Sequence, residues 1–239
     1  MTRNTLTIAK RELGAYFNSP IAYVVIAVFL FFDAYIFFSQ LFLQGQAEVR
    51  ELFTGAWSTL LLAIFAPAIT MRLLAEEKQS GTLELLITMP VSDWEVVLGK
   101  FLGAVGLFSV GLLLMTVYGF TVAALGPLDK GPAVGAYFGF LLLGGAFLAI
   151  GLMASSFTRS QVNAFVIAVL ICLGVWLVGK LVPSVPKPLQ PLMEFLGVDS
   201  HMQNTARGII DTRDLVYYAS IIAGCLLIAQ QSLASRKWR

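Results

Sequence analysis

Long apolar runs, separated by short polar segments, make up most of this chain. Each run approaches or exceeds the roughly 20 residues that an α-helix needs to cross about 30 Å of hydrocarbon. Because lipid offers no partner to backbone N–H and C=O groups, each run must satisfy them internally, as a helix does. The pattern predicts an all-α integral membrane protein with six transmembrane helices, at residues 20–43, 54–74, 96–125, 133–157, 162–182 and 215–233.

Composition supports the same class of protein. Hydrophobic residues make up 58% of the chain and charged residues 13%, and the mean hydropathy is +0.81, outside the range of ordinary soluble domains. The first apolar run is longer than the about 7–15 residues of a secretory signal core, and no small-residue cleavage pattern follows it, so we expect an uncleaved first helix. Cys172 and Cys225 fall inside predicted spans without metal-ligand spacing and indicate no redox compartment.

The distribution of Lys and Arg predicts the orientation in the membrane. With a cytoplasmic N-terminus, ten basic residues face the cytoplasm and six face outward, as the positive-inside rule expects. Six spans then place both termini in the cytoplasm. The net charge of +2 follows from this topology and implies no nucleic-acid partner. The inner set is Arg3, Lys10, Arg11, Arg72, Lys78, Lys100, Arg159, Arg236, Lys237 and Arg239, and the outer set is Arg50, Lys130, Lys180, Lys187, Arg207 and Arg213.

Residues 1–18 are predicted to form an amphipathic helix ahead of the first span. Leu6, Ala9 and Leu13 recur at helical spacing, whereas Lys10 falls on the other face. Such a helix lies in the membrane interface. The alternative is a basic flank that orients the first span and happens to be amphipathic.

Small residues and one proline predict how the spans pack. Gly99 and Gly103 are four residues apart, as are Gly135 and Gly139, so the helices that carry them can approach their neighbours closely. Pro67 removes a backbone donor inside the second span and its ring crowds the preceding turn, so we expect a kink there.

The longest loop, residues 183–214, is predicted to lie on the outer face. Its prolines impose a stiff, non-helical course at first. Residues 192–197 and 201–210 are then expected to form short helices that dip back into the bilayer. Asp211 and Asp214 resemble a cap that starts the sixth span.

The loop between the second and third spans, residues 76–95, is the main candidate for function. Gly81 permits a sharp turn after the charged start, and the apolar piece that follows is too hydrophobic to be left in water. Ser92 and Glu95 form a capping box that starts the third span. We therefore predict a short helix that is covered either by lipid headgroups or by a partner protein. The acidic flanks favour a protein, because the inner leaflet is negatively charged.

The polar segments also carry an ordered set of motifs. In the loop and the start of the third span these are Glu76-Glu77, Gly81-Thr82-Leu83-Glu84-Leu85, Pro90-Val91-Ser92 and Gly99-Lys100. This order resembles permease subunits of exporter-type ATP-binding cassette transporters, the type-two subfamily. Motifs near both ends resemble its gliding-motility branch, and the permease for copper-site maturation in nitrous oxide reductase is a more distant relative. The motifs near the two ends are Lys10-Arg11-Glu12-Leu13, Tyr16-Phe17, Ser19-Pro20-Ile21-Ala22-Tyr23, Arg207-Gly208-Ile209-Ile210-Asp211, Arg213-Asp214 and Tyr217.

The resemblance implies a half-transporter in the bacterial cytoplasmic (inner) membrane, with residues 1–239 as a single transmembrane permease domain. Residues 1–18 would be an elbow helix, residues 76–95 would hold a coupling helix that docks on a separate ATPase, and residues 183–214 would hold re-entrant helices. ATP and Mg²⁺ would bind to that ATP-binding subunit. Further partners would be a second permease chain, identical or similar, membrane lipid and an extracytoplasmic accessory protein. By position, the coupling residues would be Glu76, Glu77, Gly81, Thr82, Leu83, Glu84 and, in the turn at 155–160, Arg159.

Motifs for catalysis are missing from the sequence. A P-loop needs Gly-x-x-x-x-Gly-Lys followed by Ser or Thr, yet the Gly-Lys pairs at 99–100 and 179–180 are followed by Phe101 and Leu181. The chain is therefore predicted not to be an enzyme and to bind no cofactor or metal itself. His201 is the single histidine and cannot form a zinc site alone, so we expect a surface or helix-packing residue.

Asp33 is the ionisable residue near the middle of a predicted span. Its burial costs several kcal/mol unless it is paired, hydrated or protonated. We expect it to line a polar cavity. The alternatives are a bond to a hydroxyl such as that of Tyr35 or Ser39, or a position nearer the membrane interface.

Two other function classes stay open at this point. A secondary transporter is expected to show inverted repeats or a ring of charge, and only Asp33 points in that direction. A membrane scaffold that anchors an ATPase for a motility or envelope machine, without transport, would use the same docking loop. The apolar and small residues of the helices do not identify a substrate.

Overall fold

The computed structural model describes residues 2–44, 49–82, 91–126, 129–209 and 211–235, and all secondary structure in these ranges is helical. Six helices of the described part are long and apolar enough to cross a membrane, which confirms the predicted all-α fold with six spans. The spans are formed by α2 (Pro20–Gln44), α4 (Ala56–Thr70), α7 (Asp93–Leu114) continued by α8 (Thr116–Leu125), α9 (Lys130–Phe157), α10 (Gln161–Leu181) and α13 (Thr212–Ala234).

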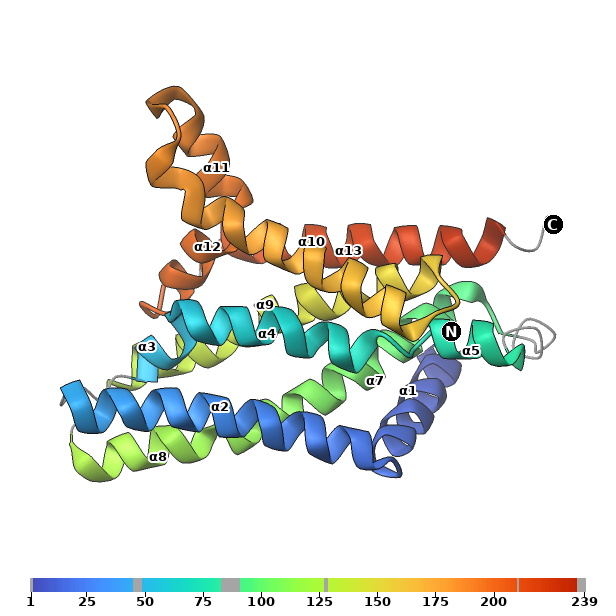
Figure 1. Cartoon of the computed structure of the whole chain (residues 1–239), viewed down its shortest axis with the longest axis horizontal. Helices are drawn as coiled ribbons and strands as arrows, with labels where there is room; N and C mark the ends of the chain where they lie inside the picture. The colour runs from blue at the N-terminus through green and yellow to red at the C-terminus, as the bar shows by residue number, and fades with distance from the viewer. Residues whose placement is uncertain (1, 45–48, 83–90, 127–128, 210, 236–239) are drawn as a thin grey trace.

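Shorter helices lie at the two ends of the bundle. One end carries α1 and α5, and the other carries α11 and α12 (Figure 1). We call these the α5 end and the α12 end. The short elements are α1 (Thr2–Phe17), α3 (Val49–Thr54), α5 (Ala75–Ser80), α11 (Gln190–Leu196), α12 (Val198–Thr205) and single 3₁₀ turns at Val182–Ser184 and Lys187–Leu189.

The central helix of the bundle is α9, which packs against α13, α10, α4, α12 and α7. It is the most buried of the spans, whereas α2 and α10 are the most exposed. In Figure 1, α4 lies between α2 and α10, and α9 runs behind it. An all-round apolar helix such as α9 suits a buried position, because every face of it contacts protein.

Glycines on α9 explain how one helix contacts so many neighbours. A Cβ on Gly135 would meet the Thr205 backbone of α12, and one on Gly144 would meet the Phe108 ring of α7. A Cβ on Gly151 would meet Thr70 at the end of α4. Close approach of helices through small residues is the usual way of packing in membranes. The prediction that Gly135 and Gly139 serve packing is confirmed, since Gly139 also faces Thr205.

The second span is interrupted at residues 71–74, which form a turn between α4 and α5. The prediction placed a single helix over 54–74 with a kink at Pro67. The helix α4 extends through Pro67 but ends at Thr70, and the Pro67 carbonyl accepts a 2.8 Å bond from the Met71 N–H, while the kink stays a prediction. The turn separates α4 from α5, which carries the start of the charged loop.

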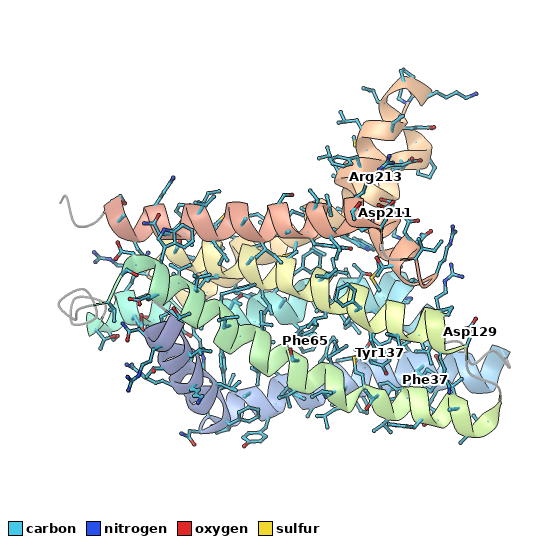
Figure 2. All side chains as sticks on the ribbon, turned by 180° about the vertical axis from the view of Figure 1, so that it is seen from behind. Phe37, Phe65, Asp129, Tyr137, Asp211 and Arg213 are labelled. Atoms are coloured by element: carbon cyan, nitrogen blue, oxygen red, sulfur yellow. The ribbon has the colours of Figure 1, made fainter. Side chains whose placement is uncertain are left out.

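The start of the last span carries a cap. The carboxylate of Asp211 accepts a 2.9 Å hydrogen bond from the backbone N–H of Arg213, as the sequence predicts. Figure 2 shows both residues at the start of α13, beside the projecting short helices. Asp214, predicted to share in this cap, instead binds His201 across the α12 end.

His201 is a buried packing residue in α12, with 6% of its surface exposed. Its Nδ1 lies 2.6 Å from a carboxylate oxygen of Asp214 and its Nε2 lies 3.0 Å from the carbonyl oxygen of Phe195. Both ring nitrogens therefore have an oxygen partner within hydrogen-bond distance. The ring also stacks on Tyr217 at 4.0 Å between centroids. These contacts fasten α11 and α12 to the start of α13.

Candidate functional site

The α5 end holds most of the residues that the sequence singles out. Helix α5 carries Glu76 and Glu77 in its first turn and ends at Gly81, whose φ of 75° lies in the left-handed region. Glycine adopts this conformation without the strain that a Cβ causes. The predicted sharp turn at Gly81 is therefore confirmed.

A buried lysine joins α5 to two other helices. The Nζ of Lys100 in α7 lies 2.7 Å from Glu77 Oε1 of α5 and 2.9 Å from Glu12 Oε1 of α1. Only 2% of the Lys100 side chain is exposed, and both carboxylates are mostly buried. A buried cation is tolerated when charged groups pair with it. We call Lys100, Glu12 and Glu77 the lysine cluster.

Glycines on α7 let α1 come close enough to complete this cluster. A Cβ on Gly99 would lie 2.6 Å from Ile8 Cγ2, and a Cβ on Gly103 would lie 2.8 Å from Glu12 Cβ. The predicted packing role of this glycine pair is confirmed, and its partner is α1. The same contact brings Asn4 to the capping box of α7, where its amide donates to Glu95 over 3.3 Å.

A polar cavity of about 700 Å³ lies beside the lysine cluster, between α1, α5 and the turn at 71–74. Arg72 from this turn stacks over the ring of Tyr16, with Cζ 4.5 Å from the centroid. The Tyr16 hydroxyl donates a 2.7 Å bond to the carbonyl of Ile69. Burial raises the pKa of Tyr16 well above its usual value, so this hydroxyl remains a neutral donor. The turn is thus held to α1 as well.

On its other side, α5 is bound to the end of α9. The hydroxyl of Ser155 accepts hydrogen bonds from the N–H groups of Leu74 (3.1 Å) and Ala75 (2.9 Å) and donates to the carbonyl of Met71 (3.0 Å). It therefore satisfies backbone groups that the turn leaves free at the start of α5. Lys78 of α5 donates to the carbonyl of Ser156.

The two segments predicted to contact an ATPase thus lie together, since α5 packs against both α9 and α10 near the turn that joins them. Glu76 and Thr82 are exposed there, as is Arg159 in that turn. Thr82 pairs with the Ser80 hydroxyl at 2.8 Å. The other predicted coupling residues, Leu83 and Glu84, lie outside the described residues, together with the rest of the predicted short helix up to residue 90.

The sequence did not identify Lys100 or Glu12 as parts of the site, and it placed Ser155 only within the turn at 155–160 that was expected to contact the ATPase. Lys100 and Glu12 appeared only within motifs, and Lys100 was counted as a charge that sets topology. The available signal was a Lys inside a predicted span and a carboxylate on a predicted amphipathic helix. Nothing in the sequence pairs residues 12, 77 and 100, which are far apart along the chain.

Asp33, the predicted intramembrane site, is fully buried in α2. The two predicted hydroxyl partners are wrong. Tyr35 is 68% exposed and points away, and Ser39 donates to the carbonyl of Ile36 in its own helix. The polar neighbour of Asp33 is Ser58 on α4. Within the described residues, His, Cys, Asp and Glu side chains form no group of three or more that could hold a metal ion.

We expect Ser155→Ala to lower the free energy of unfolding by about 1–3 kcal/mol, because it leaves three backbone groups of the turn without this partner. Ser156→Ala is the matched control, since its hydroxyl bonds only to Met153 of its own helix among the described residues. Thermal unfolding of both variants in detergent measures the difference. Equal midpoints would show that the turn does not depend on Ser155.

These features define a class of protein: a six-span helical membrane protein with a short charged helix fixed to the bundle at one end. The family model for "ABC-2 family transporter protein" matches residues 6–229, and the chain belongs to this family. A similar protein is "Probable ABC transporter permease protein NosY" of Pseudomonas aeruginosa, 37% identical over 117 residues. That alignment covers 45% of this chain and 41% of the relative. The chain is a membrane subunit of an ABC transporter, and the resemblance to type-two permeases is confirmed at the level of this family.

Proposed function

We propose that this chain is the permease subunit of an exporter and that a separate ATPase drives it by docking at the α5 end. ATP and Mg²⁺ bind to that ATPase, and two permease chains enclose the route of an unidentified substrate. The α5 end, with both termini, faces the cytoplasm of a bacterium, and the spans lie in its inner membrane. The observation that carries the proposal is the lysine cluster, which joins α5, at the start of the predicted coupling segment 76–95, to α1 and α7.

The contacts of α5 allow it to transmit a displacement to several helices. A force on the exposed face of α5 reaches α7 and α1 through the lysine cluster. It reaches α9 through Ser155 and Lys78. Since packed helices move as rigid bodies, a small displacement at this end reorients whole spans. A loop that only rested on the lipid interface would not require these buried ion pairs and hydrogen bonds.

The test is to co-express the tagged chain with candidate ATPases, purify the complex and measure ATP hydrolysis and transport in vesicles. We expect Gly81→Pro and Glu84→Arg to insert normally but to lose most of the coupling between hydrolysis and transport. Proline fixes φ near −65°, which is incompatible with the φ of 75° at Gly81. The charge reversal in Glu84→Arg places a positive charge at the proposed docking surface.

Two controls isolate the docking surface. Gly81→Asn keeps the turn, because Asn tolerates the left-handed region, and is expected to remain largely coupled. Glu194→Arg makes the same charge reversal on an exposed residue at the opposite end. Normal transport by both Gly81→Pro and Glu84→Arg would refute the docking assignment. A stable complex that hydrolyses ATP without moving any substrate would instead indicate a scaffold.

A further inference from the structure

Asp33 differs from the other buried charged residues that the structure describes. Lys100 and His201 have charged partners, and Glu95 belongs to a capping box. Asp33 has 0% of its surface exposed, and within the described residues neither carboxylate oxygen makes a hydrogen bond. The facing hydroxyl of Ser58 is equally buried and equally without a partner there. Two polar groups therefore meet inside the bundle without a network around them.

The surroundings of Asp33 are apolar and aromatic. Phe37, one turn further along α2, packs on the ring of Tyr118 at 5.3 Å, and the Tyr118 hydroxyl donates to the carbonyl of Leu30. Tyr118 is the titratable neighbour of Asp33. The helices packed on α2 are α1, α3, α4, α7 and, through Tyr118, α8, and none of their described side chains brings a charge to Asp33.

An ionised carboxylate in such a place lacks both water and a cation, and its desolvation is among the largest single penalties in a membrane protein. A protonated carboxyl avoids this penalty and can donate its hydrogen to a hydroxyl. We propose that Asp33 is a proton-binding site: its carboxyl carries a proton in this conformation and releases it when α2 and α4 separate enough to admit water.

The position of the site between two spans gives it a function. Because α2 is among the more exposed spans, it has less packing to lose than a central helix such as α9 when it moves relative to α4. Any conformational cycle that hydrates this contact then takes up and releases one proton per chain. The inference concerns the isolated chain, so its first tests need no ATPase and can fail independently of the proposed coupling.

The first test labels the purified full-length protein in detergent with dicyclohexylcarbodiimide, an apolar reagent that attacks protonated carboxyl groups. Mass spectrometry of peptides measures labelling between pH 6 and pH 9, with exposed Asp129 as the internal reference. We expect Asp33 to be labelled at pH 8, where Asp129 is not. Labelling of Asp33 that falls in parallel with Asp129 as the pH rises would overturn the proposal.

The second test does not depend on access of the reagent. The native protein must keep Asp33 protonated, while the unfolded chain ionises it above a pH of about 4. The stability of the parent therefore falls as the pH rises, and Asp33→Asn removes this loss. We expect the thermal midpoint of Asp33→Asn to rise steadily relative to that of the parent from pH 5 to pH 8, and to lie ~5 °C above it at pH 8.

Asp129→Asn is the matched control. It makes the same change at an exposed cap, where Asn serves as well as Asp, and its midpoint is expected to follow the parent at every pH. A constant offset between Asp33→Asn and the parent across the pH range would show that Asp33 is ionised in the folded protein, and the proton site would be refuted.

Discussion

Lys100→Met is expected to destabilise the protein by about 3–5 kcal/mol. It is also expected to abolish the coupling between ATP hydrolysis by a bound ATPase and transport. The substitution preserves the length of the side chain but leaves Glu12 and Glu77 facing each other without their cation. Both carboxylates are largely buried, at 16% and 17% exposure, so water does not replace the lost partner. Thermal unfolding in detergent and ATP hydrolysis by the co-purified complex measure the two effects.

A second variant separates stability from coupling. Replacing the whole lysine cluster, by Glu12→Gln and Glu77→Gln together with Lys100→Met, removes every uncompensated charge and is expected to recover most of the lost stability. If the cluster is the mechanical link, coupling stays impaired in this triple variant. Recovery of both properties would mean that the cluster serves folding alone. Lys130→Met, at an exposed position of the α12 end, controls for the loss of one positive charge.

The spans could be predicted because their cause is local in the sequence. Hydrocarbon thickness fixes the length of a crossing helix, and every lipid-facing turn must be apolar, so runs of apolar residues delimit the spans. Caps are equally local. The capping box of Ser92 and Glu95 and the cap at Asp211 involve residues at most three apart. For the same reason the turn at Gly81 was predictable from a single residue type.

The lysine cluster could not be predicted, because its three members come from three helices. A sequence shows charges at the polar ends of spans but not which of them meet. The role of Ser155 was hidden for a similar reason. A serine next to a turn commonly caps its own helix, whereas Ser155 caps α5, which lies about 80 positions earlier in the chain.

The polar partner of Asp33 could not be predicted from neighbouring positions in the sequence. Tyr35 was considered as its partner because it is near in sequence, but residues two apart on a helix point in different directions, and only those three or four apart share a face. Buried residues on the same face are Phe29 and Phe37, four positions to either side of Asp33. The polar group that Asp33 does meet, Ser58, belongs to another span, and only the packing of α2 on α4 brings the two together.

The double variant Gly99→Ala, Gly103→Ala is expected to lift α1 away from α7 and to lower stability by about 1–3 kcal/mol for each residue. The new methyl groups would meet Ile8 and Glu12 at 2.6 to 2.8 Å. Ile8 Cβ, 2.7 Å from the first methyl group, and Glu12 Cβ are both fixed to the backbone of α1, so a change of rotamer does not relieve the contacts and the helix itself has to move. Its displacement also pulls Glu12 away from Lys100.

Trypsin provides a direct readout of this displacement, because Lys10 and Arg11 of α1 are exposed cleavage points whose backbone is protected while α1 stays docked. We expect faster cleavage after these residues in the double variant, together with weaker coupling to ATP hydrolysis. The matched control is Gly111→Ala, Gly119→Ala. Its methyl groups lie on the same span with no contact closer than 3.6 Å, and alanine favours a helix over glycine. Equal cleavage rates in both double variants would show that α1 is not held by this glycine pair, and the lysine cluster would then have to hold it alone.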